Sequence, residues 1–142
     1  MGLKTLSYTD AIAGTVEARR AGADEALFLD TEAHCCEAAA SNLFIWTGRA
    51  LVTPPLSCGP LPGITRATVV DLAGSLAMPA EERAFDLTEL MNAEEAFLTS
   101  SLRGVAPLVR VGARSIGRGT PGERTRRISR AYIALVAREC GA

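Results

Sequence analysis

Apolar positions recur at helical spacing in three stretches of this 142-residue chain. The spacing predicts helices over residues 8–21, from residue 64 to about residue 74, and over residues 121–140. A shorter helix is expected over LTELMNAEE, residues 87–95. The positions expected to face inward are Ile12, Ala13 and Val16, then Ile64, Val69, Leu72 and Ala73, and finally Ile128, Tyr132, Leu135 and Val136.

Other stretches follow the pattern of strands. Residues 25–30 are apolar along ALFL, which predicts a strand buried on both faces. In CCEAAASNLFIW we expect two extended ends around an irregular Ala/Ser middle, then a hairpin turn at Gly48 and another short strand. EAFLTSS predicts a strand, and PLVRVGARSIG predicts a strand and hairpin. TPPLSCGPLPG, residues 53–63, is a Pro/Gly-rich loop. The class is therefore mixed α/β (α+β) in one compact unit.

Composition excludes several classes of function. The chain carries 15 basic and 16 acidic residues, for a net charge of −1, and the two signs are mixed along it. This balance gives no electrostatic case for binding nucleic acid or an anionic membrane. No apolar run approaches the roughly 20 residues that span a bilayer, and no secretory leader is visible. We therefore expect a cytoplasmic protein with no nucleic-acid or membrane partner.

The four cysteines and the single histidine raise the question of a metal site. His34, Cys35 and Cys36 are consecutive, while Cys58 and Cys140 lie far along the chain. A metal site needs spaced ligands that converge, and no CxxC motif is present. We therefore expect no metal site, cysteines that act as small buried apolar residues in a reducing compartment, and His34 as a turn or surface residue.

One glycine-rich motif matches the pattern of a dinucleotide-binding loop but lacks its usual context. Residues 117–122 match G-x-G-x-x-G and precede the last expected helix. A dinucleotide site would also need a preceding βαβ unit and an acidic residue about 20 residues further on. Glu139 is near that distance, but no strand is expected after this helix. The motif is therefore weak support for nucleotide binding.

Lys4 is the only lysine, and the other fourteen basic residues are arginine. Four motifs accompany it in order: KTLSY at 4–8, CEAAASNLF at 36–44, LPGITR at 61–66 and FLTSS at 97–101. The segment GVAPL at 104–108 and the turn at 117–122 also fit. Together they resemble the class IV (fold type IV) pyridoxal-phosphate enzymes, which include branched-chain aminotransferases, D-amino acid aminotransferases and aminodeoxychorismate lyases.

The resemblance implies a pyridoxal 5′-phosphate cofactor and assigns roles to two residues. Lys4 would hold the cofactor aldehyde as an imine and then move a proton during catalysis. Glu37 would keep the pyridine nitrogen protonated, so that the ring can accept electrons. Each has a plainer alternative: Lys4 as a solvated terminal charge and Glu37 as a surface acid on an edge strand.

The resemblance also implies a phosphate site. Backbone N–H groups of Ile64 and Thr65 would bind the phosphate at a helix N-terminus. Ser100 and Ser101, at the end of FLTSS, would add a hydroxyl, and Tyr8 would lie near the phenolic oxygen of the cofactor. Thr65 could also be only a helix cap. Three nearby polar residues are expected to be structural: Ser41 and Asn42 in a turn and Arg66 in a pair at the loop.

The resemblance covers residues 1–142 and implies the larger, C-terminal cofactor domain, a pseudo-barrel-like mixed sheet with flanking helices. The smaller N-terminal domain of the family is expected to be absent. The implied activity is amino-group transfer between an amino acid and a 2-oxo acid, most similar to branched-chain aminotransferases, in a homodimer. Two alternatives stay open: an aminodeoxychorismate lyase, with which SLRGVAP is compatible, and a non-catalytic domain that self-associates through an exposed apolar face.

Overall fold

The computed structural model describes residues 9–48 and 50–141. Lys4 and Tyr8 lie outside these ranges. The helices are α1 (Thr9–Arg20), the 3₁₀ turn η1 (Leu56–Cys58), α2 (Ile64–Ser75), α3 (Leu87–Asn92) and α4 (Glu123–Cys140). The strands are β1 (Leu27–Leu29), β2 (Cys35–Ala38), β3 (Ser41–Thr47), β4 (Ala50–Thr53), β5 (Ala80–Glu82), β6 (Glu95–Ser100), β7 (Gly104–Pro107), β8 (Arg110–Val111) and β9 (Arg114–Ser115).

Strand β3 is the centre of the main sheet. It pairs with β2 at its start, with β4 at its end, and with β6 from Asn42 to Trp46, all antiparallel. β1 and β7 extend the sheet beyond β2 and β6. β5 is the one parallel partner among the described strands of this sheet, and it lies beside β4. The predicted mixed α/β class with a sheet and flanking helices is therefore confirmed.

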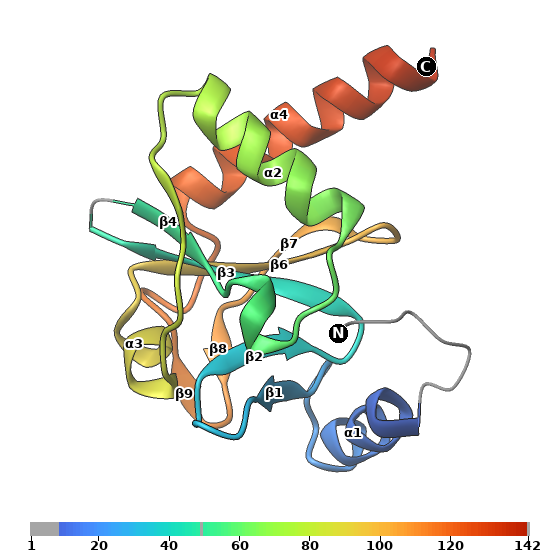
Figure 1. Ribbon diagram of the computed structural model, residues 1–142, viewed down its shortest axis with the longest axis vertical. Helices are drawn as coiled ribbons and strands as arrows, with labels where there is room; N and C mark the ends of the chain where they lie inside the picture. Colours follow the sequence, from blue (N-terminus) through green and yellow to red (C-terminus); the bar gives the residue numbers. More distant parts are fainter. Residues whose placement is uncertain (1–8, 49, 142) are drawn as a thin grey trace.

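Successive residues of β3 point to opposite faces of the sheet, and both faces are covered. On one face, Phe44 stacks on Phe97 of β6, with ring centroids 4.9 Å apart. Helices α2 and α4 lie together over this face, as Figure 1 shows, and contribute Val69 and Ile128 to the same cluster. On the other face, Leu43 and its neighbours pack with residues of α3 and the segment after β9. This double coverage explains why SNLFIW is buried without a polar alternation.

The strand predictions were partly wrong at the edges of the sheet. β1 is an edge strand rather than one buried on both faces, and Leu29 is 44% exposed. β5 was not predicted because its sequence, AEE, is wholly exposed and carries no apolar signal. β7 was not predicted either, because it covers GVAP, just before the expected strand at PLVRV. The hairpin within PLVRVGARSIG is present as β8 and β9.

The helices were predicted close to their observed limits, but several inward faces were misassigned. Ile64 is 81% exposed because it opens α2, where the buried positions are Arg66 and, at intervals of four residues, Thr65, Val69 and Ala73. Ile12 is 61% exposed. Gly14 of α1 faces Phe28 instead, leaving no room for a Cβ. Val16 and Val136 are also exposed. No helix within the described ranges is long and apolar enough to cross a membrane.

Candidate active site

The β2–β3 hairpin brings Glu37 and Asn42 opposite each other. Glu25 fixes the turn between the two strands, because its carboxylate accepts hydrogen bonds from the N–H of Ala40 and the hydroxyl of Ser41, both at 2.9 Å. Ser41 therefore supports the turn, as expected. Asn42 does not: it is a buried residue of β3, and its side chain serves another segment.

Glu37 is half-buried on this hairpin and reaches the Pro/Gly-rich loop. Its Oε2 accepts a hydrogen bond of 3.0 Å from the N–H of Leu61. Burial raises the pKa of the Glu37 carboxyl, and the hydrogen bond from Leu61 opposes that effect. The alternative that Glu37 is a surface acid on an edge strand is wrong, since Glu37 lies inside the sheet between β1 and β3. A partly desolvated carboxylate of this kind is suited to hold a protonated ring nitrogen.

Asn42 holds the same loop from the other side of Leu61. Its Nδ2 donates to the carbonyl of Leu61 at 2.8 Å. Two residues later, Gly63 packs so closely that a Cβ there would lie 2.2 Å from Asn42 Oδ1. The two hairpin residues therefore fix the backbone that leads into α2.

The N-terminus of α2 presents backbone donors with no partner among the described residues. Gly63 is the N-cap, in an extended conformation, and no side chain from residues 9–48 or 50–141 caps the helix there. The N–H groups of Ile64, Thr65 and Arg66 precede the first intrahelical bond, which Ala67 donates to Gly63. These donors and the helix dipole favour an anion such as a phosphate. Thr65 is not a side-chain cap, so that alternative is wrong.

A second set of polar groups lies beside these donors. The Thr65 hydroxyl, which is buried, is 3.5 Å from the hydroxyl of Tyr132 on α4. Tyr132 in turn lies against Gly104 of β7, where a Cβ would be 2.9 Å from the ring. Gly104 is paired with Ser100 at the end of β6. Helix α4 thus brings the start of α2 and the end of β6 together.

Thr99 is the polar residue of this region that sequence reasoning missed. It pairs with Asn42 across β3 and β6 and is 1% exposed. Its Oγ1 has no hydrogen-bond partner among the described residues. A buried hydroxyl without a partner is costly, which makes it a candidate for a bound group. Thr99 lies on the same face of β6 as Phe97, two residues earlier, and this alternation was the only sequence signal for its position.

The two predicted serines have different surroundings. Ser100 ends β6, and its hydroxyl accepts a hydrogen bond of 3.2 Å from the N–H of Arg103. Ser101 follows in the turn and is exposed. Arg103 in that turn approaches Glu25, at 3.6 Å between Nη1 and Oε2. The turn after β6 is therefore tied to the β2–β3 turn, on the side of the sheet that holds the rest of the site.

Arg66 has the structural role expected for it. It is buried, and its Nη2 donates to the carbonyl of Pro54 at 3.0 Å and to Glu82 at 2.9 Å. It therefore joins α2 to the loop after β4 and to β5. Its Nε is also buried and has no hydrogen-bond partner among the described residues.

The glycine motif before α4 serves packing. A Cβ at Gly117 would lie 2.1 Å from the carbonyl oxygen of Glu94, and one at Gly122 would lie 1.9 Å from Glu95 Cδ. The carboxylate of Glu95 accepts hydrogen bonds from the N–H groups of Arg124 and Thr125. The donors that a dinucleotide phosphate would need are thus already occupied.

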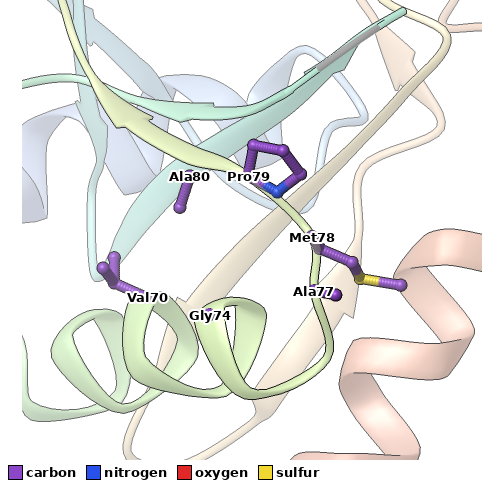
Figure 2. Close-up of a pocket in the computed structure, with 6 residues that line it drawn as sticks. All are labelled: Val70, Gly74, Ala77, Met78, Pro79 and Ala80. Carbon is purple, nitrogen blue, oxygen red and sulfur yellow. The ribbon is translucent and has the colours of Figure 1, made fainter.

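A separate hollow does not belong to the site. Figure 2 shows it between α2 and the segment leading into β5. Its lining residues are Val70, Gly74, Ala77, Met78, Pro79 and Ala80. None of these side chains is polar or charged, so the hollow offers no chemistry to an anionic cofactor.

The fold and these residues define a member of an enzyme family. The chain belongs to the class IV aminotransferases: the family model described as "Amino-transferase class IV" matches residues 1–111. The branched-chain-amino-acid aminotransferase of Pseudomonas aeruginosa is 34% identical over 131 residues, covering 92% of this chain and 42% of that protein.

Solved structures agree with this assignment. The branched-chain amino acid aminotransferase of Thermobaculum terrenum, in its PLP-bound form, superposes with a TM-score of 0.90 at 35% identity, covering 94% of this chain and 44% of that one. The enzyme of Thermoproteus uzoniensis with norvaline gives a TM-score of 0.86 at 37% identity, covering 91% and 42%. The chain spans less than half the length of these relatives.

Proposed function

We propose that this chain is the cofactor-binding domain, residues 1–142, of a pyridoxal-phosphate-dependent aminotransferase. The observation that supports this best is the pairing of Glu37 with the Leu61 loop. This hydrogen bond ties a partly desolvated carboxylate on β2 to the loop that leads directly into the uncapped N-terminus of α2. The buried hydroxyl of Thr99, which has no partner in the part of the chain that the structure describes, fits a bound polar group in the same region.

The residues fit the parts of the cofactor. Glu37 would hold the ring nitrogen in its protonated form, with Oε1 as the available oxygen. The N–H groups of Ile64 and Thr65 would bind the phosphate, with the hydroxyl of Ser100 or Ser101 as a further ligand. Tyr8 would donate to the phenolic oxygen. When bound, the cofactor supplies a ring that accepts electrons from the substrate Cα.

Lys4 would carry the proton chemistry. Its amine is the one lysine nitrogen in the chain. We propose that Nζ of Lys4 would hold the cofactor covalently and, as a free amine, would act as the base for the proton on the substrate Cα. Glu37 would support this proton transfer by keeping the bound ring cationic, which would make the Cα proton more acidic.

The substrates, assembly and location are part of the same proposal. The relatives are named as branched-chain-amino-acid aminotransferases, so the substrates would be a branched-chain amino acid and a 2-oxo acid. The assembly would be a homodimer. The four cysteines are free thiols, which suits a reducing, cytoplasmic compartment.

The first test uses the single lysine. Pyridoxal phosphate is added to the purified chain, the visible absorption is recorded, and the mixture is reduced with borohydride and mapped by mass spectrometry. We expect a covalent adduct on Lys4 that is lost in Lys4→Ala. The α-amino group is the only other amine, and its adduct would persist in the mutant. Absence of a Lys4 adduct in a folded chain would contradict the proposal.

Matched variants separate the other roles. Ser101→Ala should weaken cofactor affinity, while Ser57→Ala, at an exposed serine of η1, should not. Transfer from L-Leu and L-Glu to a 2-oxo acid is then compared with turnover of aminodeoxychorismate. Lyase turnover without any transfer would favour the lyase. Neither activity, from a chain that self-associates, would favour the non-catalytic alternative.

A further inference from the structure

Three side chains with metal-binding atoms that the proposed cofactor site does not use meet at one point. The ligand atoms of Asp30, His34 and Cys58 all lie within 4.8 Å of one another. Asp30 follows β1, His34 precedes β2, and Cys58 ends η1. The sequence pattern predicted no metal site, because its candidate ligands lack the spacing typical of ligands that come together in space. The fold, however, brings the segment of Asp30 and His34 next to the segment of Cys58.

The turn from Asp30 to His34 holds two of the three ligands in place. Asp30 Oδ1 accepts hydrogen bonds from the N–H groups of Glu32 and His34, both at 2.9 Å. Asp30 Oδ2 is thereby turned toward His34 Nδ1, at 3.2 Å. An isolated bridge to Asp86 also fixes the backbone of His34. The side chains of Asp30 and His34 are 19% and 33% exposed, so an ion can reach them.

Cys58 comes from the opposite segment. It ends the one-turn helix η1, where Gly59 follows in the left-handed conformation at φ 94°. The thiol is half-buried, and its Sγ lies within 4.8 Å of an Asp30 carboxylate oxygen and of a His34 ring nitrogen. A thiol held against a carboxylate and an imidazole is in the position of a third metal ligand.

We propose that Asp30, His34 and Cys58 form a zinc site. Thiolate, imidazole and carboxylate are the ligands of Zn²⁺, whereas Ca²⁺ and Mg²⁺ prefer all-oxygen sites. Bond lengths of about 2.0–2.3 Å place tetrahedral ligand atoms roughly 3.5 Å apart. Asp30 Oδ2 and His34 Nδ1 are already 3.2 Å apart, and the separations from Cys58 are at most 4.8 Å, so they need to shorten by no more than about 1.3 Å.

A tetrahedral zinc ion would need a fourth ligand besides these three residues. Glu32 Oε2 is 3.7 Å from His34 Nδ1 and can fill the remaining position, or a water can. Binding releases the thiol proton of Cys58, since only the thiolate is a ligand. The ion would join the β1–β2 turn to the loop that continues to Leu61. The bound ion would therefore stabilise the loop that Glu37 holds at Leu61, although Glu37 itself would not be a ligand.

Zinc titration of the tag-free chain against a chromophoric chelator tests the site. We expect one equivalent of Zn²⁺ to bind, and Co²⁺ to give tetrahedral d–d bands with a thiolate charge-transfer band. Cys58→Ser should abolish the charge-transfer band. His34→Gln and Asp30→Asn should each weaken zinc affinity at least about tenfold. Zinc should raise the melting temperature of the wild type but not of Cys58→Ser.

Cys140→Ser is the matched control, because Cys140 is exposed at the end of α4. It should bind zinc as the wild type does. Circular dichroism confirms that each variant is folded, and Cys58→Ser, at a partly exposed position, is the one expected to fold best. Absence of stoichiometric zinc binding by the folded wild type would show a hydrogen-bonded cluster only and overturn the proposal. Binding that survives Cys58→Ser, or is lost in Cys140→Ser, would also overturn it.

Discussion

Glu37 and Asn42 face each other across the β2–β3 hairpin and hold the two sides of one residue, Leu61. The carboxylate of Glu37 accepts from its N–H at 3.0 Å, and the amide of Asn42 donates to its carbonyl at 2.8 Å. A residue held at both ends has little freedom, and Ile64, the first residue of α2, lies three residues further on. The hairpin therefore positions both the proposed ring-nitrogen partner and the proposed phosphate donors.

Asn42→Ala should destabilise the fold. The side chain is 5% exposed, and its removal leaves the carbonyl of Leu61 without its donor. We expect a loss of about 1–3 kcal/mol in the free energy of unfolding, measured by urea denaturation. Asn92→Ala is the control, because Asn92 is exposed and bonds Arg114 at the surface. Equal losses in the two variants would show that the Leu61 contact carries no special stability.

Gly63→Ala and Gly74→Ala should have opposite effects. The backbone of Gly63, at φ −67° and ψ 139°, suits alanine. Its Cβ would nevertheless lie 2.2 Å from Asn42 Oδ1, so we expect a loss of about 1–3 kcal/mol. At Gly74, inside α2, a Cβ meets nothing within 4 Å, so alanine should stabilise by about 0.5–1 kcal/mol. Paired thermal or urea melts measure both, and a neutral Gly63→Ala would mean that Asn42 can move aside.

Local pattern predicted the elements that bury an apolar face. The run LFIW in β3 and the four-residue spacing in α2 both gave correct elements, because burial leaves a periodic signal in the sequence. β5 left no such signal in the sequence, because all three of its residues are exposed. Its position is set instead by its pairing with β4 and by the hydrogen bond from Arg66 to Glu82. Ile64 was wrongly predicted to face the core, because the spacing of apolar residues does not show whether the first residue of a helix reaches the core.

The family resemblance named Glu37, Thr65 and the serines, but it did not show their partners. The bond from Leu61 to Glu37 joins residues 24 positions apart, which no local pattern reveals. Thr99 lies within the FLTSS motif and Cys58 within the Pro/Gly-rich loop, but their neighbours depend on how β6 pairs and how that loop returns. Contacts of this range require the tertiary fold. Lys4 and Tyr8 lie outside the described residues, so their roles stay predictions.

Glu37→Gln should stabilise the cofactor-free chain at neutral pH. Burial raises the pKa of Glu37 above the ordinary value of 4.5. A raised carboxyl pKa means that the fold favours the protonated form, so this contribution is present below pH 4.5 and is lost as pH rises through the folded-state pKa. Glutamine keeps the oxygen that accepts from Leu61 and removes the buried charge.

The measurement is the free energy of unfolding of both chains across that pH range. The advantage of Glu37→Gln should shrink on acidification, while its affinity for pyridoxal phosphate should fall at neutral pH. Glu139→Gln, at an exposed glutamate of α4, is the control. A variant less stable than the wild type at neutral pH would show that the carboxylate is stabilised by its surroundings.

Glu95→Gln should have the opposite pH dependence. Burial alone would raise the pKa of Glu95, but hydrogen bonds from Thr125 and Arg124 outweigh it and lower the pKa below 4.5. The stability from this carboxylate is therefore present above pH 4.5 and is lost as pH falls through the folded-state pKa. Because Glu95 caps the N-terminus of α4, we expect Glu95→Gln to cost about 1–2 kcal/mol at neutral pH.

Glu94→Gln is the matched control for this prediction. Glu94 is the adjacent residue, is exposed, and pairs with Arg124 at the surface. An exposed ion pair contributes little, so its loss should cost no more than about 0.5 kcal/mol. Urea denaturation of the three chains at neutral and acidic pH separates the two effects. If Glu94→Gln costs as much as Glu95→Gln, the surface pair with Arg124 rather than the helix cap holds α4 to β6.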